Sequence, residues 1–194
     1  MEGSIFIAGA GVQWLRDRMK FFKKAPETEK IVKSLDNNND IYLVPAFTGL
    51  GAPYWDANAR GVLSGITRDT SPKEIVRATI EAVAYQTFDL FEAMKHDGLR
   101  PKIVKVDGGM VMNNWFSQFL SDIVNVKVLR PKVQETTALG AAFMAGLQIG
   151  VYKSLKDISK NWHLDKKFSP KMKNKYRSTL IKGWEKAVKR ALIN

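Results

Sequence analysis

The chemistry that this sequence can support is concentrated around two glycines and two asparagines. Gly108 and Gly109 follow a short apolar run that begins at Ile103, and Asn113 and Asn114 precede apolar residues at helical spacing. Glycine lets a flat ring or a phosphate approach the backbone, and the free N–H groups of a helix start attract anions. These residues predict a buried strand, a glycine turn and a capped helix, an arrangement typical of nucleotide sites. A tight turn with no ligand is the alternative that they leave open.

A second corner of the same kind lies near the N-terminus, and its signal is weaker. Residues 4–8 are expected to form a short strand, and Gly9 and Gly11 stand between it and a helix that begins near Val12. The turn at 107–109 has no Gly-Lys-Ser/Thr after its glycines and no Gly-x-Gly-x-x-Gly pattern. This excludes a Walker A loop and a dinucleotide fingerprint there.

The elements that would hold these corners alternate between strands and helices. Runs of β-branched and aromatic residues predict short strands at 41–44, 61–67, 103–106 and 127–131. The clearest helix begins after Ser71, because Ser71 suits the N-cap, Pro72 suits the first turn and Glu74 completes a capping box. This helix is expected to run to about His96 and to be the central one. The order of the elements predicts an α/β fold.

Two further segments carry expectations about packing. The helix expected at 136–150 is so rich in alanine and glycine that something should pack very close to it, either at a hinge or in an ordinary core contact. The loop 45–56 is rich in glycine, proline and aromatic residues. It is expected either to be packed by its own aromatic rings or to face a cleft.

The composition is that of a globular chain with one sizeable core. The sequence has 194 residues, of which 45% are hydrophobic, and it contains no cysteine. Disulfides, thiolate chemistry and cysteine-ligated metals are therefore excluded. No long uncharged run and no basic N-terminal segment are present, so we expect no membrane span and no signal peptide. A cytoplasmic location is compatible with this composition.

The formal net charge of +12 is concentrated in the C-terminal part of the chain. Basic residues are frequent beyond Tyr152, where only Asp157, Asp165 and Glu185 are acidic. Aromatic residues are not interleaved with them as a nucleic-acid stacking platform requires, so no nucleic-acid binding is expected. We expect residues 152–194 to form a basic helical extension, with Trp184, Val188 and Leu192 on its buried side. It would pack on a domain formed by residues 1–151.

Four segments of the chain carry a family pattern, namely residues 2–17, 45–61, 106–114 and 137–142. They resemble the FGGY family of carbohydrate kinases, and the run 61–81 is similar to that family's second signature. The loop Thr48-Gly-Leu-Gly-Ala-Pro-Tyr-Trp55 resembles glycerol kinases rather than pentulose or gluconate kinases. The resemblance covers essentially the whole chain and corresponds to the C-terminal part of such kinases. It implies the ribonuclease H-like, actin-like ATPase fold, without the first strands of the C-terminal domain.

The resemblance also implies a binding site. The family's nucleotide contacts correspond to Gly9 and Gln13 after the first expected strand, and to Gly109, Met110 and Asn113 after the strand at 103–106. The two corners would then face one cleft and hold the adenosine part of ATP or ADP, with Mg²⁺ bridging the phosphates. Met110 stands where the family tends to carry a small residue, and only its backbone is expected to matter.

The resemblance places the rest of the chemistry in the family's N-terminal domain. The residues that clamp glycerol, the catalytic aspartate and the phosphate-binding hairpins all belong there, so no residue of this chain is assigned a catalytic or metal-binding role. The expected function is phosphorylation of glycerol to sn-glycerol 3-phosphate by a complete, homo-oligomeric enzyme. The alternatives are an inactive split-gene fragment, a basic binding module, and a kinase of another polyol or sugar.

The missing N-terminal half, on the same or a separate chain, should matter for folding as well. Without its strands, the segments 4–8 and 103–106 are expected to expose unpaired edges and to favour aggregation. The helix centred on Gly140 corresponds to a connecting segment at which the family's domains pivot.

Overall fold

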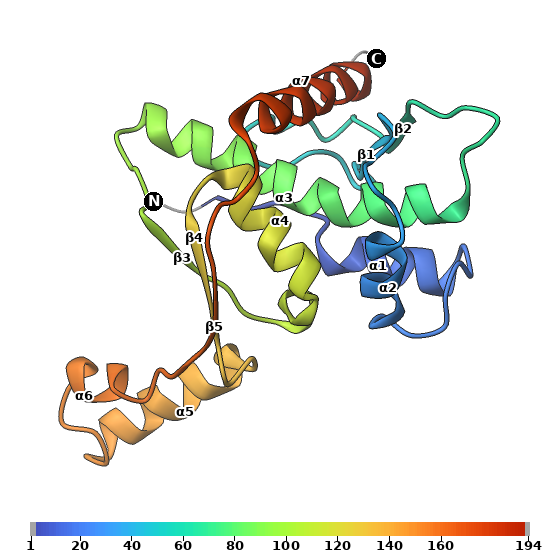
Figure 1. The fold of residues 1–194 in the computed structure, drawn as a ribbon. Coiled ribbons are helices and arrows are strands. Elements are labelled where there is room, and N and C mark those ends of the chain that lie inside the picture. Colours follow the sequence, from blue (N-terminus) through green and yellow to red (C-terminus); the bar gives the residue numbers. More distant parts are fainter. Residues whose placement is uncertain (1–2, 193–194) are drawn as a thin grey trace.

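Figure 1 shows a long central helix with most other elements packed around it and one lobe that projects away. This computed structural model describes residues 3–192, so residues 1–2 and 193–194 of the expected domains, including Glu2 of the segment 2–17, lie outside it. None of the helices in residues 3–192 has the length and apolarity needed to cross a membrane. In chain order the elements are α1 (Gly9–Asp17), α2 (Glu27–Lys33), β1 (Tyr42–Val44), β2 (Val62–Ser64), α3 (Pro72–His96), β3 (Ile103–Lys105), the 3₁₀ helix η1 (Gly109–Met112), α4 (Asn114–Val124), β4 (Lys127–Pro131), α5 (Thr136–Gln148), α6 (Leu155–Ser159), β5 (Leu164–Phe168) and α7 (Asn174–Ala191).

The central helix α3 begins where the capping signals predict. The Ser71 hydroxyl oxygen accepts a hydrogen bond from the Lys73 N–H at 3.2 Å, and a Glu74 carboxylate oxygen accepts one from the Ser71 N–H at 2.9 Å. The predicted capping box is therefore confirmed. Between Glu74 and Gln86 nearly every residue is buried, rather than one face alone. α3 contacts α1, α2, α4 and β1, so it is the element on which the others pack.

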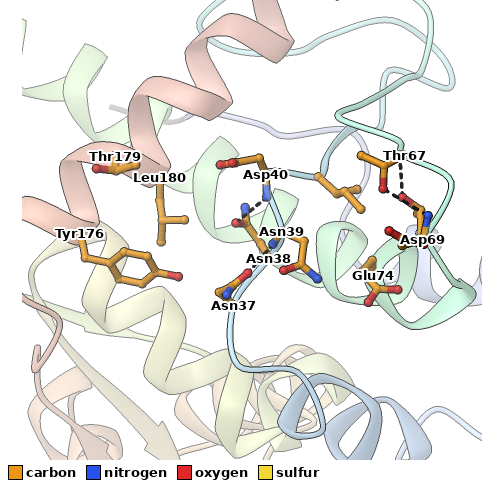
Figure 2. A pocket seen from close by; sticks show the side chains of 12 residues that line it. Asn37, Asn38, Asn39, Asp40, Thr67, Asp69, Glu74, Tyr176, Thr179 and Leu180 are labelled. Atoms are coloured by element: carbon orange, nitrogen blue, oxygen red, sulfur yellow. Dashed lines mark hydrogen bonds between the residues drawn. The ribbon is translucent and has the colours of Figure 1, made fainter.

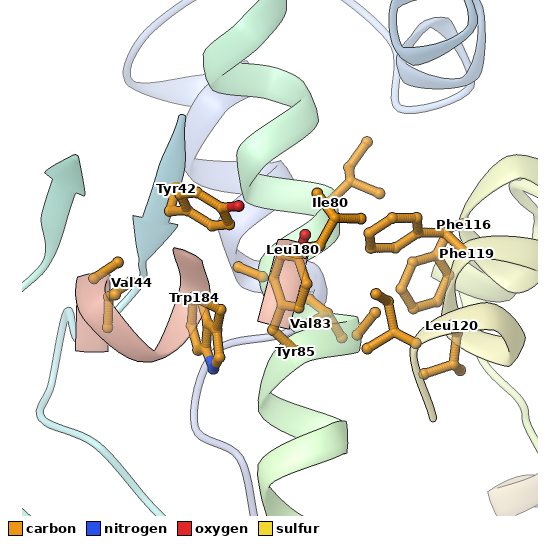
Figure 3. Close-up of a cluster of buried hydrophobic side chains, with 14 of the residues drawn as sticks. Tyr42, Val44, Ile80, Val83, Tyr85, Phe116, Phe119, Leu120, Leu180 and Trp184 are labelled. Atoms are coloured by element: carbon orange, nitrogen blue, oxygen red, sulfur yellow. The ribbon is translucent and has the colours of Figure 1, made fainter. Parts of the chain in front are cut away.

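The main hydrophobic core joins α3 to α4 and α7 (Figure 3). Trp184 of α7 is fully buried and stacks on Tyr85 of α3, with ring centroids 5.3 Å apart. Tyr85 also meets Phe119 of α4 edge-on at 5.6 Å. Such aromatic pairs contribute roughly 0.5–1.5 kcal/mol each beyond the area that they bury. The predicted buried side of the last helix is confirmed at Trp184 and Val188, whereas Leu192 lies just past the helix and is partly buried.

The larger sheet has three strands in the order β3-β4-β5. β3 pairs with β4 in parallel, and β4 pairs with β5 in antiparallel fashion. β5 corrects the expectation that the chain beyond Tyr152 is helical throughout. The sequence of β5, Leu-Asp-Lys-Lys-Phe, lacks the apolar pattern that predicts a strand. The reason is that β5 is an exposed edge strand in which only Phe168 is buried.

The strand expected at residues 4–8 does not form. The Ser4 carbonyl accepts a hydrogen bond from the Ala52 N–H at 3.0 Å, and the Ile7 carbonyl accepts one from the Gln86 side-chain amide at 3.2 Å. β3 is also less buried than expected, since Ile103 is 53% exposed. Both differences have one cause. Within residues 3–192, β3 has a strand neighbour on one side only and the segment 4–8 has none, whereas strands are stabilised by cross-strand contacts.

The helix α5 forms as expected, but within residues 3–192 the close packing predicted for it is limited to Gly146, where an added Cβ atom would lie 2.9 Å from the ring of Tyr152. Gly146 is its one buried residue, and Met144 is 51% exposed. Ile149 and Val151, which follow the helix, are also exposed. In Figure 1, α5 and α6 project from the rest of the molecule as one lobe. Apart from Gly146, the small residues of α5 are therefore not explained by contacts inside the described chain.

The loop 45–56 is bound to the core by hydrogen bonding to the buried carboxylate of Asp89. Its Tyr54 hydroxyl donates a hydrogen bond to an Asp89 carboxylate oxygen at 2.9 Å, and the Trp184 indole N–H donates to the same oxygen at 2.7 Å. Burial raises the pKa of Asp89 to about 6, although both hydrogen bonds favour the charged form. Protonation of Asp89 is therefore coupled to the stability of the fold.

We expect Asp89→Asn to make stability less dependent on pH. Because the pKa of Asp89 is higher in the folded than in the unfolded chain, the folded state binds more protons between about pH 4 and 6. Asp89 therefore makes the wild-type free energy of unfolding decrease as the pH rises from about 4 to 6. Asparagine does not titrate, so the variant lacks this contribution. The effect is at most roughly 3 kcal/mol for a shift of about two pKa units.

Urea unfolding of both proteins at pH 4 and pH 8 measures this effect. The quantity to compare is the difference in free energy of unfolding between variant and wild type, measured at each pH. Any destabilisation caused by the amide itself is the same at both pH values and cancels in this comparison. Parallel pH profiles for the two proteins would contradict the prediction.

Candidate functional site

The five residues that the sequence and its family resemblance single out line one cavity. Gly9, Gln13, Gly109, Met110 and Asn113 surround a space of about 350 Å³. It lies between α1, the start of α2, the middle of α3 and the turn that leads through η1 into α4. Two corners that are far apart in the sequence therefore meet at a single cavity.

Helix α1 brings Gly9 and Gln13 to the cavity from one side. Leu15 is fully buried and Gly11 lies against α3, so another face of α1 packs on the core. Ala8 at the N-cap provides no side-chain hydrogen bond to the helix. The first N–H groups of α1 thus have no side-chain cap, and their partial positive charge favours an anionic group nearby.

The opposite wall depends on a turn that glycine adopts easily. Gly108 has a φ of +82°, in the left-handed region, and it redirects the chain from β3 into η1. Asn113 then caps α4, because its side-chain oxygen accepts a hydrogen bond from the Phe116 N–H at 3.0 Å. The predicted cap is confirmed for Asn113, whereas Asn114 is the first residue of the helix.

The cavity wall combines apolar surface with a few polar groups. The apolar side chains belong to Val12, Ile80, Met110 and Met112. The amide and hydroxyl groups belong to Gln13, Thr28 and Asn113. Arg16 adds a cation, which is paired with Asp17 at 2.7 Å. Apolar walls with a small number of placed polar groups are the usual composition of a small-molecule site.

Comparison with known proteins assigns the chain to a family. Residues 1–149 match the C-terminal domain of the FGGY family of carbohydrate kinases. The chain belongs to this family. Glycerol kinase 1 of Pseudomonas aeruginosa is 56% identical to it over 190 residues, and the glycerol kinase of Thermoanaerobacter pseudethanolicus is 52% identical over 193 residues. These alignments cover 98% and 99% of this chain but only 38% and 39% of the relatives, so the chain spans well under half of their length.

A solved structure agrees with this assignment. Glycerol kinase of Plasmodium falciparum with ADP superimposes with a TM-score of 0.87 at 38% sequence identity. The superposition covers 98% of this chain and 38% of that one. The expected actin-like ATPase fold of an FGGY C-terminal domain is therefore confirmed.

The cavity wall that α2 forms in this FGGY domain was not predicted from the sequence. The segment 23–40 reads as polar and charged, yet its residues Ala25, Pro26, Thr28 and Glu29 line the cavity. A local signal was present, because a proline followed by acidic residues is typical of a helix start. The contact with α4 has no such signal. There the Asn114 N–H donates a hydrogen bond to a Glu29 carboxylate oxygen at 3.3 Å.

Glu29 is the carboxylate of the cavity wall, and its oxygens are already occupied. Lys33 lies 2.5 Å from one oxygen, and the Asn114 N–H reaches the other. Burial alone would raise the pKa of Glu29, but these hydrogen bonds outweigh burial and hold the pKa below its ordinary value. Within residues 3–192 no group of three or more histidine or acidic side chains is placed to hold a metal ion. The wall offers hydrogen-bonding groups to a ligand.

A larger cavity of about 600 Å³ lies elsewhere on the domain (Figure 2). Its wall carries Asp40, Asp69 and Glu74 and no basic residue. The negative potential of such a wall repels phosphate groups. We therefore assign the candidate site to the smaller cavity, although size alone favours the larger one.

The glycines of the cavity provide a direct test of its open space. A Cβ atom at Gly9 or Gly109 would meet nothing within 4 Å beyond its own chain neighbours, whereas one at Gly11 would lie 3.0 Å from a methyl carbon of Thr79. We expect Gly9→Leu and Gly109→Leu to keep the wild-type melting temperature within a few degrees. Gly11→Leu should destabilise the chain by roughly 1–3 kcal/mol through overpacking.

Thermal unfolding followed by circular dichroism measures all three variants. A loss of stability in Gly109→Leu as large as that in Gly11→Leu would mean that the fold itself needs the space.

Proposed function

We propose that the smaller cavity binds the adenosine part of ADP or ATP. The observation that carries the proposal is that Gly9, Gln13, Gly109, Met110 and Asn113 line one cavity. The two glycines leave room for a flat ring, and the uncapped start of α1 favours an anionic ligand. Support also comes from the P. falciparum glycerol kinase, which has the same fold and was solved with ADP.

The complete protein is proposed to phosphorylate glycerol to sn-glycerol 3-phosphate with ATP as the phosphoryl donor. Identities of 56% and 52% to two glycerol kinases support this substrate. Phosphoryl transfer requires a positioned acceptor and charge neutralisation around the γ-phosphate, and no residue of this chain is assigned to either task. The nucleotide is proposed to bring its own Mg²⁺, and the chain alone is expected to bind nucleotide without turnover. The complete enzyme is proposed to be a cytoplasmic homo-oligomer.

The N-terminal part of the enzyme is proposed to dock on the α5 lobe. α5 is apolar around its whole circumference, and such helices are normally buried. Met144, Ile149 and Val151 in this lobe are 51%, 77% and 65% exposed. The relatives contain a large polypeptide beyond the 38% and 39% of their length that this chain matches. A polypeptide of that size is sufficient to cover the lobe.

Calorimetric titration of Mg-ADP into the purified chain tests the nucleotide proposal. We expect saturable binding that Asn113→Ala weakens by about tenfold, because a ligand hydrogen bond and the α4 cap are both lost. Asn113→Asp keeps an oxygen for the cap but removes the amide N–H, so it should also weaken binding while keeping the fold.

Lys186→Gln is the matched control, because it removes an exposed positive charge on α7 away from the cavity. It should leave the affinity unchanged. Binding that Asn113→Asp leaves intact but salt and Lys186→Gln reduce strongly would favour a basic binding module instead.

The docking proposal predicts a dependence on the exposed apolar side chains of the lobe. We expect the wild-type chain, co-expressed with the N-terminal part of P. aeruginosa glycerol kinase 1, to form a complex that phosphorylates glycerol. The double variant Met144→Asp/Ile149→Asp should lose most of that complex, because buried carboxylates without partners are costly. Both side chains are exposed in the chain alone, so its melting temperature should change little. Equal recovery of activity by the two proteins would place the docking face elsewhere.

A further inference from the structure

Thr28 of α2 lies in the cavity wall, and its contacts determine which of its atoms donate and accept hydrogen bonds. Its side chain is almost fully buried, with 4% of the residue exposed, and its hydroxyl donates a hydrogen bond to the Ala25 carbonyl at 2.7 Å. A hydroxyl has one hydrogen, so the Thr28 oxygen is left as an acceptor only. The Asn113 amide nitrogen lies 3.4 Å from that oxygen and donates to it.

The oxygen and the nitrogen of the Asn113 side-chain amide therefore have different hydrogen-bond partners. Its oxygen accepts from the Phe116 N–H at 3.0 Å, and its nitrogen faces Thr28. A flipped amide would set its oxygen against a Thr28 oxygen that has no hydrogen left to give, and its nitrogen against a backbone N–H. These contacts favour one orientation of the amide without any ligand, and within residues 3–192 no hydrogen bond occupies its second N–H.

A second contact keeps α2 in register with the start of α4. The Glu29 carboxylate accepts a hydrogen bond from the Asn114 N–H at 3.3 Å. Consecutive residues of α2 thus bind consecutive residues at the start of α4. The part of α2 and the start of α4 that line the cavity are therefore held together.

We propose that Thr28 is a positioning residue for the nucleotide site, which orients the Asn113 amide so that its free N–H meets an acceptor atom of the bound base. This inference rests on the proposed binding of adenosine nucleotides. A donor that is already oriented loses less conformational freedom on binding, and affinity rises accordingly.

The test uses Thr28→Val, which keeps the shape of the side chain and removes the hydroxyl, together with Thr28→Ser, which retains it. Titration of Mg-ADP should give roughly three- to tenfold weaker binding for Thr28→Val, as expected when one side chain must be ordered on binding. Thr28→Ser should recover most of that loss. In an Asn113→Ala background, Thr28→Val should cause no further weakening, because the amide through which it acts is gone. An equal factor in both backgrounds would overturn the proposal.

A second readout needs no nucleotide. In the ¹⁵N spectrum, the side-chain amide pair of Asn113 is identified by its loss in Asn113→Ala. It should move in Thr28→Val and stay near its wild-type position in Thr28→Ser. An unmoved pair, with wild-type binding of Mg-ADP intact, overturns the role of Thr28 alone. A wild-type chain that binds no Mg-ADP overturns the proposed function and this inference together, whether or not the pair moves.

Discussion

The fold depends on keeping one charged pair inside α3 fully satisfied. Glu81 has no exposed surface, and its carboxylate accepts hydrogen bonds from Arg77 Nε at 2.7 Å and from the Tyr85 hydroxyl at 3.1 Å. Burial raises the pKa of Glu81, while the charge and hydrogen bond of Arg77 act against that rise. Removing one member of such a pair leaves an uncompensated buried charge, which would destabilise the middle of the helix on which α1, α2, α4 and β1 pack. Arg77 also donates to the Leu35 carbonyl, at 2.6 Å, just past α2. The same pair thus fixes the wall of the candidate site.

Prediction from sequence succeeded where the deciding contacts are local. The whole cap of α3 lies within the four residues from Ser71 to Glu74, and Asn113 caps α4 through an N–H only three residues away. The segment 4–8 has a strand-like sequence but no partner strand within residues 3–192, so its pattern alone could not form a strand. β5 is the reverse case, because its charged residues face solvent while β4 supplies the ladder. Strands need a neighbour, and the sequence of one strand does not state whether it has one.

The candidate site also has parts that can be predicted from local sequence and parts that cannot. Its two glycine corners have local signatures, and the family resemblance supplied the residue positions within them. The start of α2 has a local signal, but its contact with α4 has none, because no residue pattern in the segment 23–40 predicts a contact with Asn113. Thr28 contacts Asn113 because α2 and α4 both pack on α3. Long-range contacts of this kind follow from the core, which is why the residues that orient a site are harder to read from sequence than those that form its turns.

A glycine indicates a binding surface most clearly where neither the backbone conformation nor the packing of the fold requires glycine. Gly108 is explained by its positive φ, which other residues adopt at a cost. Gly9 and Gly109 have no positive φ, and a Cβ atom at either would meet nothing within 4 Å beyond its own chain neighbours, so packing gives no reason for glycine there. The close approach of the proposed ligand would give one. Gly140 in α5 has the same open surroundings, although glycine inside a helix costs roughly 1 kcal/mol relative to alanine. Around Gly140, however, the surface is helical and apolar rather than a cavity with polar groups. We therefore propose that the missing side chain makes room for a nucleotide at the cavity and for a polypeptide at α5.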